Sequence, residues 1–257
     1  MKKVQKALDM NYQDINARTV DLWVENGWEW GTPISHEVYD KAKNGEWDVL
    51  LTPVRPVPHA WFGKLEGKKI LGLASGGGQQ MPIFSALRAE CTVLDYSSRQ
   101  LEAERMVAER EGYRINIVHG DITKPLPFGN DSFDLIFFPV ANCYVENMRP
   151  IWQECFRILK KGGPLLAGMD NGTNFIFDDT ETKVEYTLPF NPLVCEEHRR
   201  SLGKDGGIQF SHTIEDLIGE QLTAGFRLTD IYEDTNRRGN LYKHHIPTFW
   251  ATRAVKE

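Results

Sequence analysis

The sequence predicts an α/β fold built on a mostly parallel sheet. From Lys69 onward, short apolar runs alternate with amphipathic stretches of roughly ten to fifteen residues. Runs that are apolar throughout are typical of strands covered on both faces. Strand and helix in series imply right-handed crossovers and therefore parallel strands. The last two runs follow each other with no predicted helix between them, which favours a terminal antiparallel hairpin.

Helices are predicted between these runs from capping and periodicity. Ser97 and Gln100 form a capping box ahead of a helix that Gly112 is suited to end. Apolar residues at helical spacing predict two further helices, over 151–159 and 214–224. The predicted strands cover 69–73, 91–94, 115–119, 133–138 and 164–169, and the final pair covers 226–232 and 247–255.

Residues 1–58 are predicted to form a separate N-terminal segment of helices and a connector. Apolar residues recur at helical spacing over 14–26. Thr32 and Pro33 suit the N-cap and first position of a second helix. The prolines of 53–58 favour an extended connector, because they donate no amide hydrogen bond.

The remaining residues, 59–257, are predicted to form one domain with an insertion. Residues 171–210 are aperiodic, and an insertion of this length beside the carboxyl edge of a sheet is suited to cover a substrate. Aromatic residues, including Trp28 and Trp30, are dense in the N-terminal part. We therefore expect residues 10–60 to close a pocket as a lid, together with residues 171–210.

Composition limits the function. The chain has 257 residues, 41% hydrophobic and 26% charged, enough to bury a large core. Its net charge of −6 is a poor match to a polyanion, which argues against a non-specific nucleic-acid binder. The four cysteines have no metal-site or C-x-x-C spacing, so we expect reduced thiols, no metal and a cytoplasmic location. The basic start lacks an apolar segment, and no apolar run approaches ~18 residues, so export and membrane insertion are not expected.

One motif indicates a ligand. Glycines Gly76 to Gly78 follow the first predicted strand, where they allow a sharp turn and a close approach of backbone amides to a ligand. Asp95 ends the second run, about twenty residues further on, where a carboxylate is suited to accept both hydrogens of a ribose diol. An ordinary glycine turn is the alternative. Loop and acid together favour a cofactor that contains adenosine.

In this order, five segments make the chain resemble the class I S-adenosylmethionine-dependent methyltransferases of the small-molecule, type 11-like kind. They are KILGLASGGGQQ, TVLDYS, HGDIT, FDLIFFPV and ILKKGGPLL, and the resemblance covers residues 66–170 and the final hairpin. It implies a Rossmann-like three-layer sandwich with a seven-stranded, mostly parallel sheet and an antiparallel last strand, to which the N-terminal helical lid is added. It also implies S-adenosylmethionine as the cofactor.

The resemblance assigns cofactor contacts to residues that follow the first four predicted strands. Two positions depart from the family pattern, since Gly72 stands where an acid is usual and Ala74 where the first loop glycine is usual. Another group must then contact the amino-acid end of the cofactor. The assigned residues are Ala74, Ser75, Gly76 and Gly78 beside the methionine part, Asp95 at the ribose, Tyr96 and Gln100 flanking the adenine, Asp121 and the Ile122 amide at its polar edge, and Pro139 and Val140 near the sulfonium.

The implied reaction is in-line methyl transfer to a small-molecule acceptor, for which the protein supplies alignment and exclusion of water. An acceptor hydroxyl or protonated amine also needs a base, and histidine is the usual candidate. Single histidines are more often structural, so no catalytic residue is assigned. His59 and His212 fall where pocket walls are expected, His119 ends the third predicted strand, and His244 and His245 lie in the loop between the last two strands.

Two alternatives stay open. Gly72-x-Ala74-x-x-Gly77 fits the dinucleotide fingerprint of an NAD(P)-dependent oxidoreductase, although Gly72 then falls inside the strand. A protein that binds S-adenosylmethionine without catalysis would also explain the departures at positions 72 and 74. A nucleic-acid substrate is not favoured, because the segment 138–142 lacks the Asn/Asp-Pro-Pro-aromatic loop of enzymes that methylate bases.

Overall fold

The computed structural model describes residues 11–203 and 206–257, and the expectation about the basic first ten residues lies outside them. One seven-stranded sheet has the order β3-β2-β1-β4-β5-β7-β6. Strand β7 is antiparallel to both of its neighbours and the other strands are parallel. The predicted sheet is therefore confirmed. The strands are β1 Lys69–Leu73, β2 Glu90–Asp95, β3 Ile115–His119, β4 Leu135–Phe138, β5 Pro164–Asp170, β6 Phe226–Asp234 and β7 Phe249–Lys256.

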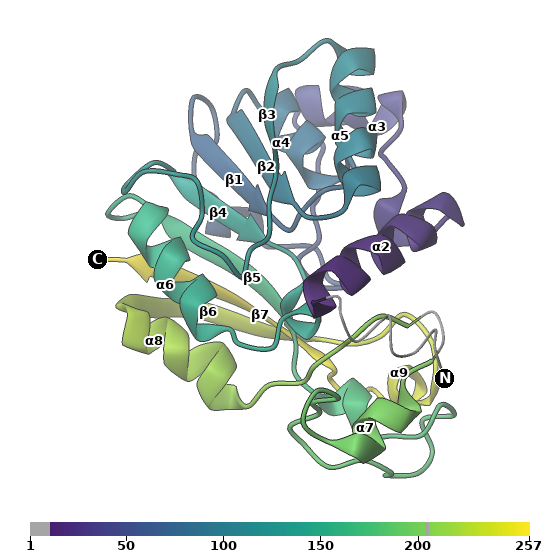
Figure 1. Ribbon diagram of the computed structural model, residues 1–257. Helices are drawn as coiled ribbons and strands as arrows, with labels where there is room; N and C mark the ends of the chain where they lie inside the picture. The colour runs from purple at the N-terminus through teal and green to yellow at the C-terminus, as the bar shows by residue number, and fades with distance from the viewer. Residues whose placement is uncertain (1–10, 204–205) are drawn as a thin grey trace.

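Helices cover both faces of this sheet, which makes three layers (Figure 1). Alternate residues of β1 enter different cores. Leu71 packs in the cluster that contains Trp152 of α6, whereas Ile70 packs in the cluster that contains Phe84 of α4. Burial on both faces explains why the strand sequences are apolar throughout. The helices are α3 His36–Lys43, α4 Gln80–Ala86 and α5 Ser98–Glu111 on one side, and α6 Arg149–Ile158 and α8 Glu220–Ala224 on the other.

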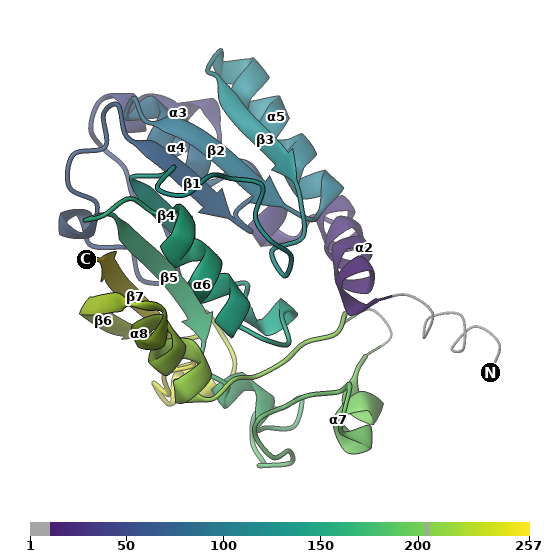
Figure 2. The same cartoon turned by 60° about the vertical axis from the view of Figure 1, so that its left-hand side comes forward.

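The carboxyl ends of the parallel strands share one edge, and two segments lie beyond it. Helix α2 (Tyr12–Glu25) and residues 171–203 and 206–210 of the insertion, which contain α7 (Glu196–Ser201), are both on this side in two views (Figures 1 and 2). Asn16 of α2 joins them, because its side chain donates to the Ile208 carbonyl at 2.8 Å and accepts from the Ile208 amide at 2.7 Å. The N-terminal segment and the insertion therefore meet.

The start of the second N-terminal helix differs from the prediction. Helix α3 begins at His36 with Ser35 as its N-cap, whose hydroxyl oxygen accepts from the Val38 amide at 3.3 Å. The Thr32–Pro33 cap was wrong because the following residue, Ile34, donates its amide to the Gly78 carbonyl at 3.0 Å. That bond to the glycine loop keeps this part of the chain outside the helix.

Two short helices were also missed. Helix α9 (Asn240–Lys243) lies between β6 and β7, where no helix was predicted, and α7 interrupts the segment read as aperiodic. Each has too few turns to show a periodic pattern. Of the described helices, none is both long enough and apolar enough to cross a membrane.

Candidate functional site

Two adjoining cavities lie at the carboxyl edge of the sheet. The larger cavity, about 300 Å³, extends over the ends of β1, β4 and β5, and the smaller cavity, about 100 Å³, over the ends of β2 and β3. Together they reach the lower range of volumes found for small-molecule sites. Their shared wall shows that they are neighbours, since both are lined by Val20, Ala74, Asp95, Ala141 and Tyr144.

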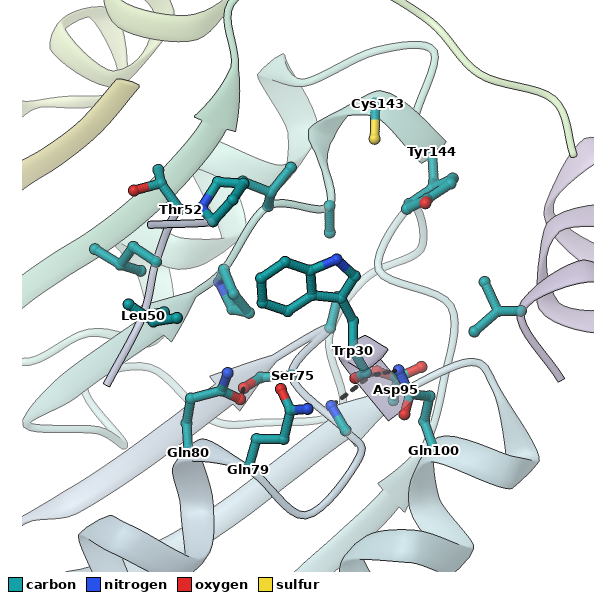
Figure 3. Close-up of a pocket in the computed structure, with 18 of the residues that line it drawn as sticks. Trp30, Leu50, Thr52, Ser75, Gln79, Gln80, Asp95, Gln100, Cys143 and Tyr144 are labelled. Atoms are coloured by element: carbon teal, nitrogen blue, oxygen red, sulfur yellow. Dashed lines mark hydrogen bonds between the residues drawn. The ribbon is translucent and has the colours of Figure 1, made fainter. Parts of the chain in front are cut away.

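The glycine loop between β1 and α4 forms one wall of the larger cavity (Figure 3). Ala74 has a φ of +48° and Gly77 a φ of +95°, so the backbone turns through the left-handed region. A side chain at Gly76 would have its Cβ only 2.6 Å from Cβ of Gln100. Glycine at this position lets the loop pack directly against α5.

Asp95 ends β2 at the boundary of the two cavities. Its Oδ2 accepts the Gly76 amide at 3.0 Å, and its Oδ1 accepts the Ser97 amide at 2.9 Å. Burial raises the pKa of this carboxyl group, and the hydrogen bonds from Ser97 and Gly76 oppose that rise. Each oxygen keeps a lone pair for a ligand hydroxyl, since a carboxylate has about four acceptor positions.

The structure brings together ten of the eleven residues assigned to the cofactor. Gly78 lines neither cavity, and its amide donates instead to the buried carboxylate of Glu104 at 2.9 Å. The contacts of all eleven assigned residues with a cofactor stay a prediction. The larger cavity is lined by Ala74, Ser75, Gly76, Asp95, Gln100, Pro139 and Val140, and the smaller one by Ala74, Asp95, Tyr96, Asp121 and Ile122.

Two side chains that line the smaller cavity, those of Tyr96 and Asp121, also form hydrogen bonds within the protein. The Tyr96 hydroxyl donates to Asp14 of α2 at 2.6 Å, and its ring stacks on His119 with the ring centroids 5.2 Å apart. Asp121 accepts both the amide and the hydroxyl of Thr123, at 2.8 and 2.7 Å. Asp121 therefore shapes the turn after β3 as well as lining the cavity.

The tryptophan turn, residues 28–31, covers the larger cavity from the N-terminal side. The Gln79 side-chain amide holds it to the glycine loop with bonds of 2.9 Å to the carbonyls of Glu29 and Thr32. In Figure 3 the Trp30 indole lies across the cavity. The guanidinium carbon of Arg237, from the loop between β6 and β7, lies 4.6 Å from the centre of the Trp30 ring. Three distant segments thus meet at this wall.

No histidine lines either cavity, although all seven fall within the described ranges. His212 is buried beside the Asn142 carbonyl at 3.0 Å, and burial lowers its pKa. His59 stacks on Trp47 with ring centroids 4.0 Å apart. These contacts are structural, as expected for single histidines.

Sequence reasoning missed Asp170, the last residue of β5, which lines the larger cavity. It is 6% exposed, and its carboxylate accepts the Gly172 amide at 2.8 Å and the Asn174 side-chain amide at 2.7 Å. Burial raises its pKa to about 6. The available signal was an acid at the carboxyl end of a buried parallel strand. Cys143, Tyr144 and Phe249 were also missed, whereas the segment 50–53 belongs to residues 10–60, which were expected to close the pocket.

Comparison with known proteins identifies the family. A family model described as a methyltransferase domain matches residues 71–167. Over 250 residues the chain is 41% identical to the uncharacterized methyltransferase YbaJ of Bacillus subtilis (strain 168), covering 94% of this chain and 97% of that protein. The chain belongs to the class I S-adenosylmethionine-dependent methyltransferases.

Other members of the family resemble this methyltransferase less completely. A demethylmenaquinone methyltransferase of Clavibacter sepedonicus is 34% identical over 100 residues, which cover 39% of this chain and 40% of that protein. An S-adenosylmethionine-dependent methyltransferase from Mesorhizobium loti shares the fold, with a TM-score of 0.62 and 19% identity over 77% of this chain and 94% of that one.

The residues of this methyltransferase fit S-adenosylmethionine, its cofactor. Asp95 presents acceptor positions where the two cavities meet. In the described part of the chain, Oε1 of Gln100 is buried and has no hydrogen-bond partner, although the residue lines the larger cavity. Among the same residues, no group of three or more His, Cys, Asp and Glu side chains is placed to hold a metal ion.

Proposed function

We propose that this methyltransferase transfers a methyl group to a small-molecule acceptor by in-line displacement. The observation that carries the proposal is the pair of adjoining cavities of about 300 and 100 Å³, with Asp95 at their boundary. When bound, S-adenosylmethionine supplies an electrophilic methyl group on a sulfonium. The relative named for demethylmenaquinone supports an acceptor of small-molecule size.

The order of the strand ends supports the proposed placement of the cofactor. Asp121 and Ile122 follow β3, and we assign them, with Tyr96, to the adenine in the smaller cavity. Asp95 at the end of β2 would hold the ribose. Farther along the edge, the loop after β1, with Ala74, Ser75 and Gly76, leads to Pro139 and Val140 after β4, which we assign to the neighbourhood of the sulfonium. Gln100, predicted to flank the adenine, lines the larger cavity and not the smaller one, so we assign it to the methionine side instead.

The amino-acid end of the cofactor needs a contact that replaces the missing acid at Gly72. A Cβ at Gly72 would lie 2.8 Å from both Sδ and Cε of Met81, so the side chain of Met81 fills this space. Gln80, the preceding residue, lines the larger cavity, and its Oε1 accepts the Ser75 hydroxyl at 3.1 Å. We assign Gln80 and Ser75 as the neutral polar partners of this end.

We further propose that residues 10–60 act as a lid together with residues 171–210. Val20 of α2 and the tryptophan turn line the cavities, and Asn16 ties α2 to the insertion. A covered cavity would exclude water from the reacting groups, which strengthens electrostatic interactions inside it. Release of product would then require the lid to open.

Charge and cysteine chemistry support two further parts of the proposal. A net charge of −6 favours a small metabolite over nucleic acid as the substrate. The four cysteines are free thiols, which agrees with work in the reducing cytoplasm.

Calorimetric titration with S-adenosylhomocysteine and with NAD tests the proposed function. The wild-type protein should bind S-adenosylhomocysteine and not NAD. The Asp95→Asn variant should bind it more weakly, whereas Asp230→Asn, which changes an exposed acid outside both cavities and outside the proposed lid, should bind it like the wild type. Binding of NAD without S-adenosylhomocysteine would favour the oxidoreductase. Mass spectrometry of a metabolite extract incubated with S-adenosylmethionine then separates an enzyme from a non-catalytic binding protein.

A further inference from the structure

We propose that Asp170 binds the methyl acceptor and takes its proton, so that the acceptor is a neutral or cationic molecule presenting an N–H or O–H group at this carboxylate. This inference rests on the proposed function, which it deepens by naming a catalytic residue and a substrate class. Four observations support it: the place of Asp170 in the sheet, its hydrogen bonds, the charge of the cavity wall and the aromatic side chains around it.

The place of Asp170 follows from the strand order. Along the carboxyl edge, the order β3-β2-β1-β4 carries the residues assigned to the adenine, the ribose, the methionine part and the sulfonium. The next strand is β5, and Asp170 is its last residue. For in-line attack, the acceptor atom must lie on the side of the methyl carbon that is opposite the sulfur. The β5 end is the next position on the wall of the larger cavity.

Asp170 is held rigidly, as a group that aligns a substrate must be. Its backbone pairs with Asn142, the amide donating to Asn142 Oδ1 and the carbonyl accepting from Asn142 Nδ2, both at 2.9 Å. Its carboxylate receives the Gly172 amide and the Asn174 side chain. Two donors leave acceptor positions on a carboxylate, so one further N–H or O–H can be accommodated.

The charge of the cavity wall selects the acceptor. Within residues 11–203 and 206–257, no lysine or arginine lines the larger cavity, and its only carboxylates are Asp95 and Asp170. With Asp95 assigned to the ribose, Asp170 is the carboxylate left for the acceptor. Arg237, which lies against the Trp30 ring, is not a lining residue, and its charge is paired with Glu29 at 2.7 Å. A carboxylate or phosphate group placed beside it would be repelled, whereas a hydrogen-bond donor or a cation would be attracted.

Aromatic side chains complete this part of the wall. Trp28, Trp30, Tyr144 and Phe249 line the same cavity. Such rings bind an apolar or flat molecule by burial, and their faces attract a cationic group. Negative charge at one point among aromatic rings is therefore complementary to an amine, a phenol or an alcohol with an apolar body.

The proton balance of the transfer gives Asp170 its chemical role. As the acceptor atom bonds to the methyl carbon, the carbon–sulfur bond breaks and its electron pair stays on sulfur. The acceptor proton passes to the Asp170 carboxylate and from there to water. It leaves a neutral amine, phenol or alcohol as the new bond forms, and it leaves a protonated amine beforehand, because nitrogen needs a free lone pair to attack. A pKa of about 6, raised by burial, makes Asp170 a stronger base than an exposed carboxylate while leaving it ionised at neutral pH. The other titratable groups that sense its charge are Cys143 and Tyr144, both on the turn after β4.

A binding experiment tests the charge preference without turnover. Benzylamine and benzoate, two probes of similar size, are titrated by ligand-observed NMR into protein saturated with S-adenosylhomocysteine. In the wild type benzylamine should bind more tightly than benzoate, and Asp170→Asn should shrink this preference at least tenfold. Asp230→Asn, which changes an exposed acid outside both cavities and outside the proposed lid, should leave it unchanged. An equal preference in Asp170→Asn and the wild type would overturn the inference.

A turnover experiment tests the proton transfer. The protein is incubated with S-adenosylmethionine and a mixture of amines, phenols, alcohols, carboxylates and phosphates, and mass spectrometry identifies the methylated products. These should come from the amines, phenols or alcohols, and kcat/KM should fall below about pH 6. Asp170→Asn should lower kcat about 100-fold or more, as expected for loss of a base. It should also remove the acidic limb of the pH profile, which is the fall of kcat/KM below about pH 6. Asn174→Ala removes a bond that lowers the pKa of Asp170, so it should move the limb to higher pH.

The two proposals fail in different ways. Asp170→Asn should keep the wild-type affinity for S-adenosylhomocysteine, because Asp170 is not among the residues assigned to the cofactor. A wild-type protein that binds no S-adenosylhomocysteine contradicts the proposed function itself. Normal binding together with methylation only of carboxylates or phosphates, or with an unchanged pH profile in Asp170→Asn, contradicts the role of Asp170 alone.

Discussion

The buried carboxylate of Asp170 should cost the protein stability at neutral pH. Its pKa is raised by burial from 3.8 to about 6, which means that the folded protein disfavours the charged form. The neutral side chain of the Asp170→Asn variant avoids this penalty and keeps nearly the same shape. We therefore expect Asp170→Asn to raise the free energy of unfolding at pH 8, although it removes a proposed catalytic group.

The size of the effect follows from the pKa difference. A shift of one unit corresponds to about 1.4 kcal/mol, so this shift corresponds to about 3 kcal/mol at a pH above both pKa values. The asparagine amide has a single acceptor oxygen, so it keeps only one of the hydrogen bonds from Gly172 and Asn174 and loses the other, which costs about 1 kcal/mol. The net gain expected at pH 8 is about 2 kcal/mol.

The direction of the pKa shift determines the pH range over which the free energy of unfolding changes. Below the unfolded pKa of 3.8 the carboxyl group is neutral in both states, and its contribution to stability is fully present. As the pH rises from about 4 to about 6, the unfolded chain ionises more readily than the folded protein, and this contribution is lost. The difference between Asp170→Asn and the wild type should thus grow across this window and then level off.

Urea unfolding of both proteins at pH 4.5, 6 and 8 measures this difference. Asp179→Asn, which changes an exposed acid, should show almost no such trend and serves as the control. If the stabilities of Asp170→Asn and the wild type run parallel over this range, the folded protein does not disfavour the charge. That result would refute the inference that burial raises the pKa of Asp170 and thereby makes it a stronger base.

Three further predictions concern the glycine loop and the residues that contact it. Asp95→Asn should weaken binding of S-adenosylhomocysteine about tenfold or more in calorimetry, because charge-assisted hydrogen bonds contribute about 1.5–3 kcal/mol; unchanged affinity would contradict the ribose assignment. Gly72→Asp should lower the free energy of unfolding by about 1–3 kcal/mol in urea, because its Cβ would lie 2.8 Å from Met81 Sδ, and a variant of wild-type stability would show that Met81 moves freely. Glu104→Gln should gain stability relative to the wild type as the pH rises from about 4.5 to about 8, because burial raises the pKa of Glu104 to about 8; a constant difference in urea unfolding at pH 5 and 8 would argue against that.

The fold was predictable because its signals are local. Each strand buries both faces, so its sequence is apolar throughout, and the glycine loop with Asp95 stands at fixed distances along the chain. The start of α3 was not predictable in the same way. The bond from Ile34 to Gly78 joins residues far apart in sequence, and it outweighs the local preference of Thr32 and Pro33 for a helix start.

The residues of the candidate site likewise fall into two groups, those that local sequence predicts and those that only tertiary structure reveals. The cofactor residues follow strand ends directly, and the resemblance to a family named their positions. Asp170 also follows a strand, but the sequence contains 36 acidic residues, and only tertiary structure distinguishes a buried one. Its environment is built from Asn142, Asn174 and Phe249, together with the tryptophan turn more than a hundred residues away. No pattern within one segment reports that environment.

The departures at positions 72 and 74, which a protein without catalysis would also explain, are accommodated by the structure. Ala74 adopts the left-handed conformation that its Cβ disfavours, and the loop keeps its turn. Gly72 faces Met81, whose side chain would have to move to make room for an acid at this position. In the described wall of the larger cavity, negative charge is then confined to Asp95 and Asp170. A protein that only binds its cofactor has no need of the second carboxylate, and a buried acid that weakens the fold is better explained by catalysis at that place.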